Sequence, residues 1–303
     1  GPDKIMIAAG TYDEGAAQFV KGVEVVSENA VFANVWNFGV NSDTGRDFDM
    51  ETAEKFTVTG DLTVGQFYAE KNANVYVKID GNLTTVGSFG AKLATQVDVN
   101  GTVTVTPPQN GAAQVMVYGT MNVTGTLDVT TGAMGAVLRV GDGRYETEYG
   151  KGGVLNVSGA DASVVLRNNT GSAIPVTVSA MSSLNISGGA TFANETGGMQ
   201  NLGTVNVDNA TLTLGGTLEN SGTVTVSGTS VLNISALTGE IVLADGAMLT
   251  DSSVGGTVSA EGNVSVAGTT SVDRLVLKGV RGENSELSIG ADAVVAVKQL
   301  EVG

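Results

Sequence analysis

The first group of residues that could do chemistry is a polar segment from Asn41 to Asp49. Its carboxylates Asp43, Asp47 and Asp49 are spaced around Gly45. Closely spaced oxygen ligands around a glycine can wrap a hard cation such as calcium. The glycine is misplaced for an EF-hand loop and no glutamate closes the segment, so a polar turn held by Asx hydrogen bonds is the alternative. Calcium is the one cofactor that the sequence suggests.

Two aromatic residues, Trp36 and Phe38, come just before this segment. An exposed aromatic ring can stack on a sugar ring, whereas an aromatic residue in a strand often belongs to the core. Both residues are therefore candidate ligand-binding residues on the condition that their rings face the solvent.

A second candidate site is the glycine-flanked insertion 141–153. It gathers the densest polar and aromatic group of the chain, namely Arg144, Tyr145, Glu146, Glu148 and Tyr149. Loops on a rigid scaffold often carry recognition, and tyrosine and arginine are favoured contact residues. A solvated loop that shields one face of the protein is the alternative interpretation. The sequence leaves both open.

The chain has no histidine and no cysteine among its 303 residues. Serine-histidine and cysteine-histidine catalysis and zinc-thiolate sites are therefore excluded. No run of about 18 apolar residues predicts a membrane span. The composition favours a binding or structural protein over an enzyme, and we expect no membrane insertion through this segment.

The charge of the chain is strongly acidic, with a formal net charge of −16 and no lysine or arginine from Asn168 to Asp273. Nucleic-acid affinity comes largely from lysine and arginine, which displace counterions from phosphates. We therefore expect no nucleic-acid partner. The acidity is explained most simply by solubility.

The candidate site residues must be positioned by the repeating unit of the chain, which consists of a strand, a tight turn and a second strand. Clear examples are Val97–Val105, Met121–Val129 and Thr223–Leu232. A unit of about 20 residues cannot bury its apolar face alone, so neighbouring units must stack. The sequence predicts an all-β, single-stranded parallel β-helix, or β-solenoid, of roughly a dozen or more coils. Outward-facing polar positions are predicted for Asn122, Asn156, Asn185, Asn206 and Asn233.

Stacked repeats share one continuous core, so residues 1–303 are expected to form a single domain. Neither end resembles a polar cap, which suggests a fragment of a longer protein. Residues 1–150 hold 14 of the 15 aromatic residues and predict irregular coils, while 151–303 predict plainer coils of glycine, threonine and valine. Helix should be scarce: Glu51–Lys55 alone has mild helical character, and a turn is the alternative there.

Two family resemblances add to this interpretation. Asp3–Glu14 and Lys21–Val25 resemble the first coils of pectin-lyase-like β-helices, and this similarity implies a right-handed coil. Phrases such as Val123–Leu127 and Leu184–Gly188 resemble the β-helical passenger and stalk regions of bacterial autotransporters and adhesins. The second resemblance covers most of the chain.

Together these features predict a non-enzymatic protein that is extracellular or at the cell surface, a bacterial adhesin or structural stalk that binds a glycan or a cell-surface protein through its loops. The alternative is a polysaccharide-lyase-type enzyme with a calcium-dependent groove near Asp43, Asp47 and Asp49. The oligomeric state is left open.

Overall fold

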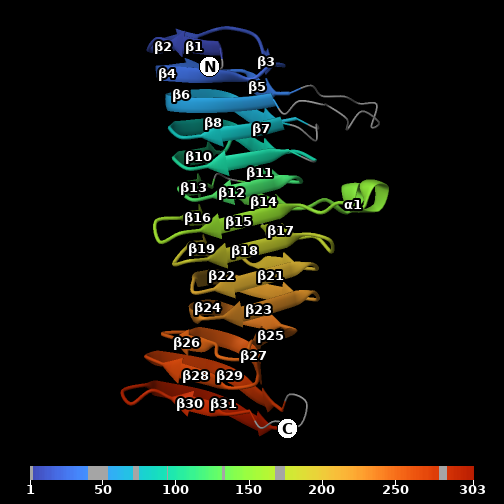
Figure 1. The fold of residues 1–303 in the computed structure, drawn as a ribbon, viewed down its shortest axis with the longest axis vertical. Helices are drawn as coiled ribbons and strands as arrows, with labels where there is room; N and C mark the ends of the chain where they lie inside the picture. The colour runs from blue at the N-terminus through green and yellow to red at the C-terminus, as the bar shows by residue number, and fades with distance from the viewer. Residues whose placement is uncertain are drawn as a thin grey trace.

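The structure is a computed structural model that describes residues 3–39, 54–70, 75–93, 95–131, 134–167, 175–279 and 285–303. Its chain winds into a β-solenoid of about 13 coils, with 67% of residues in strands. Figure 1 shows an elongated rod with the two termini at opposite ends. The predicted all-β parallel solenoid of a dozen or more coils is confirmed.

Strands follow one another along the chain with short connections. The N-terminal coils contain β1 (Asp3–Ile7), β2 (Gly10–Tyr12), β3 (Ala17–Phe19), β4 (Val23–Phe32), β5 (Val35–Phe38), β6 (Glu54–Ala69), β7 (Val75–Ile79) and β8 (Asn82–Ala91). The middle coils contain β9 (Gln96–Val99), β10 (Thr102–Thr106), β11 (Ala113–Val117), β12 (Thr120–Val123), β13 (Thr126–Val129), β14 (Ala136–Val140), α1 (Gly143–Tyr149), β15 (Val154–Ser158), β16 (Ser163–Leu166), β17 (Val176–Val178), β18 (Ser183–Ser187), β19 (Thr191–Asn194), β20 (Met199–Asn201) and β21 (Thr204–Asp208). The C-terminal coils contain β22 (Thr211–Asn220), β23 (Thr223–Ser227), β24 (Thr229–Thr238), β25 (Glu240–Leu243), β26 (Met248–Thr250), β27 (Ser253–Glu261), β28 (Val264–Ala267), β29 (Thr269–Lys278), β30 (Leu287–Ile289) and β31 (Val294–Val302).

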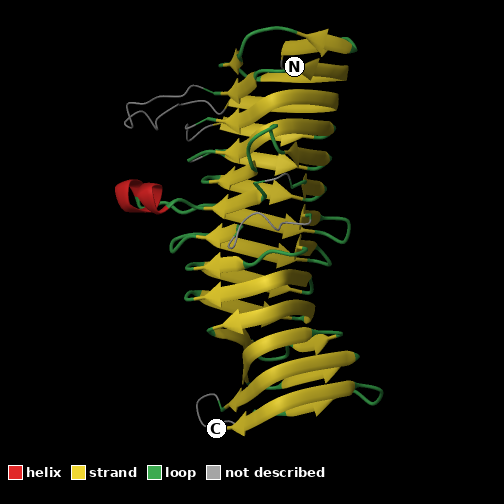
Figure 2. Ribbon diagram, turned by 180° about the vertical axis from the view of Figure 1, so that it is seen from behind, coloured by secondary structure: helices red, strands yellow, loops and turns green. Residues whose placement is uncertain are grey.

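In the middle of the rod, each coil contributes one strand to each of three sides. The first side is the parallel series β9, β12, β15, β18 and β21. The second is β10, β13, β16 and β19, and the third is β11, β14, β17 and β20. Figure 2 shows these strands from behind, stacked along the rod. Parallel pairing places the backbone hydrogen bonds along the rod axis and points side chains alternately inward and outward.

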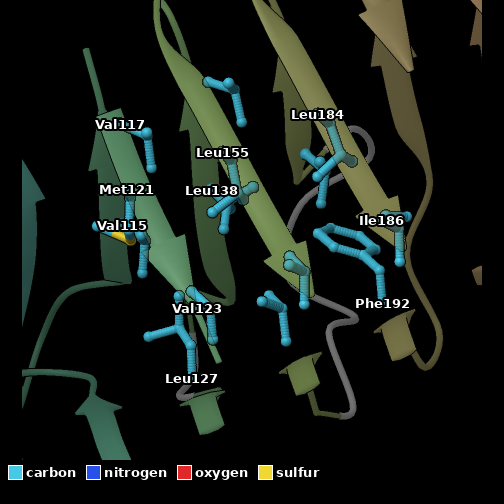
Figure 3. Packing of buried hydrophobic residues seen from close by; sticks show 14 of the residues in the cluster. Val115, Val117, Met121, Val123, Leu127, Leu138, Leu155, Leu184, Ile186 and Phe192 are labelled. Atoms are coloured by element: carbon cyan, nitrogen blue, oxygen red, sulfur yellow. The ribbon is translucent and has the colours of Figure 1, made fainter. Parts of the chain in front are cut away.

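The core is a set of inward columns in which one apolar residue lies on the next. On the first side, Val97, Met121, Leu155, Leu184 and Val205 are opposite one another in successive strands, and each is fully buried. Figure 3 shows Met121, Leu155 and Leu184 on their neighbouring strands. Burying one fully exposed aliphatic side chain contributes about 1.5–3 kcal/mol. The columns therefore supply the stability that no single coil has.

Larger aromatic side chains fill the core of the N-terminal coils. Phe38 packs at 4.8 Å from Phe67, and Phe67 packs at 5.6 Å from Phe89, between ring centroids. Trp36 and Phe38 are 2% and 0% exposed. Their rings therefore face the core and lack the exposure that stacking on a sugar requires.

Glycines between the first and second sides allow the tight turns to stack closely. A Cβ placed on Gly101 would lie 2.1 Å from the carbonyl oxygen of Gly81, and one on Gly125 would lie 2.1 Å from that of Gly101. Real Cβ atoms do not approach a backbone oxygen so closely. These turns therefore need glycine because of backbone proximity.

The outer surface of the first side carries a ladder of asparagine side chains, which we call the asparagine ladder. Asn122 Nδ2 donates to Asp98 Oδ1 at 2.7 Å. Asn156, Asn185 and Asn206 each donate from Nδ2 to the Oδ1 of the preceding asparagine at 2.8 Å. Every amide therefore donates toward the N-terminal end of the rod, and Asn122, Asn156 and Asn185 also accept from the next coil.

At the N-terminal end of the asparagine ladder, the Asp98 carboxylate accepts the hydrogen bond from Asn122. The same carboxylate also accepts from Tyr76 Oη at 2.6 Å and from Gln96 Nε2 at 2.9 Å. An ionised carboxylate has acceptor sites alone, so it satisfies three converging donors. Asn233, which the sequence grouped with the ladder residues, lies instead on the second side between Thr213 and Ser253.

Substituting Asn156→Ala should lower the free energy of unfolding by about 1–3 kcal/mol, because it removes two ladder hydrogen bonds worth about 0.5–1.5 kcal/mol each. Chemical denaturation followed by circular dichroism measures this. Asn233→Ala is the matched control, since the Asn233 side chain makes no hydrogen bond to the described residues. Equal destabilisation by the two substitutions would contradict a stabilising ladder.

Partial burial, with the hydrogen bond to Asp98 and its charge, raises the pKa of Tyr76 to about 12 from its usual 10.0. The folded protein favours the neutral phenol, so this contribution to stability is complete below pH 10 and is lost as the pH rises toward 12. Ultraviolet titration of tyrosinate, with Tyr76→Phe subtracted, should show this late ionisation. Asp98→Asn should lower the pKa of Tyr76 toward its usual value of 10.0. A pKa near 10 for Tyr76 in the wild type would contradict the proposed effect of Asp98.

Candidate functional site

The candidate site is an excursion between β14 and β15, residues 141–153, which we call the α1 arm. Figure 1 shows α1 standing away from the side of the rod. Asp142 caps the helix by accepting from the Arg144 backbone N–H at 2.8 Å, and Gly150 ends it in the left-handed conformation, with φ of 62°. The sequence predicted a loop here and mild helicity at Glu51–Lys55. The structure shows a helix at Gly143–Tyr149 in place of the predicted loop. Glu54 and Lys55 are not helical but begin strand β6, while residues 51–53 lie outside the described residues.

Glu146 points from α1 back toward the rod. It is 8% exposed. Its Oε1 accepts from the Ser182 hydroxyl at 2.8 Å and from the Met181 backbone N–H at 3.1 Å. The Ser182 hydroxyl oxygen in turn accepts from the Gly153 backbone N–H at 3.0 Å. Glu146 was predicted as a ligand-binding residue, but these contacts show it attached to the following coil.

Glycines at the base of the arm lie against the rod. A Cβ on Gly141 would lie 1.8 Å from the Ser182 hydroxyl oxygen, and φ of Gly141 is +83°. A Cβ on Gly153 would lie 1.9 Å from the carbonyl oxygen of Val117. The close contacts at both positions and the positive φ of Gly141 require glycine. The backbone at both ends of the arm is therefore packed tightly against the rod.

A row of tyrosine rings runs from the rod onto the helix. The ring centroids of Tyr118 and Tyr145 are 5.4 Å apart, and those of Tyr145 and Tyr149 are 6.1 Å apart. Tyr118 follows β11 and is 8% exposed, whereas the two helix tyrosines are half-buried. We call these three residues the tyrosine row. It offers flat apolar faces and hydroxyl groups together, which suits recognition of ligands that are apolar on one face and polar at their edges.

Electrostatics around the row favour neutral phenols. Burial raises the pKa of Tyr118, although a hydrogen bond with the Arg139 guanidinium acts in the opposite direction. Burial also raises the pKa of Tyr145, and the charge of Asp142 adds to this. The raised pKa values keep the Tyr118 and Tyr145 hydroxyl groups protonated at neutral pH.

The outer face of α1 carries an ion pair. Arg144 Nε lies 3.2 Å from Glu148 Oε1, and the two side chains are 72% and 44% exposed. Solvent screens an exposed pair at this spacing, so it contributes little to stability. Both groups are therefore accessible to a ligand at small cost to the fold.

The structure thus brings together Arg144, Tyr145, Glu148 and Tyr149 on α1, where the charged pair is exposed and the two tyrosines are half-buried. Trp36 and Phe38 are separate from this group, because both lie in the N-terminal core. Asp43, Asp47 and Asp49 lie outside the described residues. Sequence reasoning missed Tyr118, Arg139 and Ser182. Arg139 lies in β14, the strand just before the insertion, and could have been found from its sequence position. Tyr118 directly follows β11, the strand that pairs with β14. Ser182 belongs to the next coil, and nothing in the local sequence indicates its contact with the arm.

Other features of the described residues offer little for catalysis. They contain no group of three or more acidic side chains placed to hold a metal ion. A hollow of about 410 Å³ is lined by residues without an acidic or basic side chain, namely Ala33, Asn34, Val35, Gly65, Gln66, Val86 and Pro108. A second, of about 300 Å³, has Asp273 and Lys298, which form an ion pair at 2.5 Å. Neither hollow presents an unpaired acid and base together.

Comparison with known proteins found no matching family model, no similar curated protein and no similar solved structure. Among the helices in the described parts of the chain, none is long and apolar enough to cross a membrane. Function is therefore inferred from the geometry of the rod and the α1 arm.

Proposed function

We propose that the protein is an extracellular or cell-surface rod, of the bacterial adhesin or stalk type, that binds a glycan or protein ligand through the α1 arm without catalysis. The observation that carries this proposal is the arm itself, a short helix that stands off a rigid solenoid and is held at its base by Glu146 and Ser182. An insertion that merely filled space would not need such attachment.

The chemistry of the arm supports recognition. Tyrosine and arginine are enriched among the residues that dominate binding energies, because they combine large contact area with directional hydrogen bonds. Tyr145, Tyr149 and Arg144 are all on α1, with Tyr118 behind them on the rod. The sequence offers no cysteine or histidine for catalysis, which agrees with a binding role.

The rod supports presentation. Parallel strands about 4.8 Å apart, stacked through about 13 coils, hold a loop at a fixed distance from either end of the solenoid. The resemblance of the repeated phrases to adhesin and autotransporter passengers agrees with this use. Acidic character keeps such a rod soluble and separates it from nucleic acids.

The double substitution Tyr145→Ala and Tyr149→Ala should weaken ligand binding by at least about tenfold, since truncating a central aromatic contact costs about 1–2 kcal/mol or more. Binding to a glycan array, mucin and matrix proteins provides the measurement. Tyr68→Ala is the matched control, because Tyr68 is also a half-buried tyrosine facing outward on the third side.

Loss of binding in the double variant alone supports the proposal. Unchanged binding by the double variant, or cleavage of an acidic polysaccharide that depends on calcium, would overturn it. The second outcome would favour the lyase alternative.

A further inference from the structure

We propose that Ser182 is a positioning residue for ligand binding: its hydroxyl, with Glu146, forms a clasp that fixes the orientation of α1 and so sets the affinity of the tyrosine row. This inference rests on the proposed function of the α1 arm. It assigns a binding role to a side chain that lies on the following coil and outside the arm.

The helix needs such a clasp because of its length. α1 has seven residues, and isolated helices shorter than about 12–15 residues are marginal in water. Its internal backbone bonds include Glu146 N–H to Asp142 O and Gly150 N–H to Glu146 O, both at 3.0 Å. The cap at Asp142 stabilises the first turn but does not fix where the helix lies on the rod, and the exposed Arg144–Glu148 pair contributes little. Contacts with the rod must therefore supply most of what holds the helix in place.

Three parts of the arm converge on one hydroxyl group. Gly141 at the start of the arm lies against Ser182 Oγ, Glu146 in the helix accepts its hydrogen, and Gly153 at the end donates to its oxygen. A hydroxyl has one donor and two acceptor positions, so the Ser182 side chain can bind the helix through Glu146 and the end of the arm through Gly153 at the same time. The Met181 N–H adds a second donor to the same Glu146 oxygen.

The position of Ser182 is itself fixed. The residue is 3% exposed, and it directly precedes β18, whose Ser183 pairs with Val154 of β15. The Ser182 backbone N–H donates to Ser179 O at 2.9 Å, and its carbonyl accepts from Thr204 N at 3.0 Å. The clasp therefore transfers the rigidity of the solenoid to the helix.

This arrangement affects binding through entropy. A helix already ordered in the free protein does not lose that freedom when a ligand binds, so more of the contact energy becomes affinity. Without the clasp, the contact of Tyr145 with Tyr118 would be left to hold α1, and the ligand would have to order the helix and its two tyrosines further. Affinity should then fall although every contact residue is still present.

The experiment compares Ser182→Ala, Glu146→Ala and Glu146→Gln by two readouts in the full chain. Hydrogen exchange of the Glu146 and Gly150 amides reports α1 order without ligand, and the glycan-array or protein target of the wild type reports affinity. Ser182→Ala and Glu146→Ala should increase exchange by about tenfold or more and weaken binding to a similar extent. Glu146→Gln should stay close to wild type in both readouts, because its amide oxygen can accept the same two hydrogen bonds.

Ser183→Ala is the matched control, since Ser183 is the adjacent serine but faces outward. It should change neither readout, and thermal unfolding of the rod should be similar in all four variants. Unchanged α1 exchange in Ser182→Ala would overturn the inference, as would a Glu146→Gln variant as damaged as Glu146→Ala. Increased exchange with unchanged affinity would also overturn the binding role of Ser182. Should no ligand be found, the exchange readout alone still tests the clasp, so its failure is distinguishable from failure of the proposed function.

Discussion

The rest of the structure depends on the register of the parallel strands. The short strands of the middle coils pair without register shifts, so each side chain there must be compatible with the side chains directly before and after it. Aliphatic residues satisfy this rule in the core, where Leu155 lies between Met121 and Leu184. Asparagines satisfy it outside, since an amide can donate to one neighbour and accept from the other. One geometric constraint thus explains both the dry interior and the polar ladder.

The side-chain ladders also have a direction. In the asparagine ladder every donor points toward Asp98, and a second series at the adjacent tight turns behaves alike, with Thr124 donating to Asn100 and Asn100 to Asp80. Lys78 pairs with the Asp80 carboxylate at 2.8 Å. Each series ends on a carboxylate, Asp98 or Asp80, that accepts a hydrogen bond from the last amide. Carboxylates at these places therefore have a structural explanation before a functional one.

Sequence predicted the fold well because the repeat is local. Alternating residues in Val97–Val105 reveal strands, and Gly101 reveals the turn, without knowledge of the rest of the chain. The α1 arm was located by its composition, but its helix was missed because a short helix depends on tertiary support. The role of Glu146 was also missed, since its partner Ser182 is 36 residues away. The burial of Trp36 and Phe38 depended on the direction of side chains in β5, which periodicity alone left undecided.

The asparagine ladder has a consequence for how such a protein changes over evolutionary time. Each asparagine offers a donor to the coil before it and an acceptor to the coil after it, so a duplicated coil that carries one asparagine could be inserted between Asn156 and Asn185 and find complementary neighbours at once. Such a gene duplication would lengthen the rod by about 4.8 Å without disturbing either end. Selection can therefore adjust the length of the rod one coil at a time, in small and nearly neutral steps.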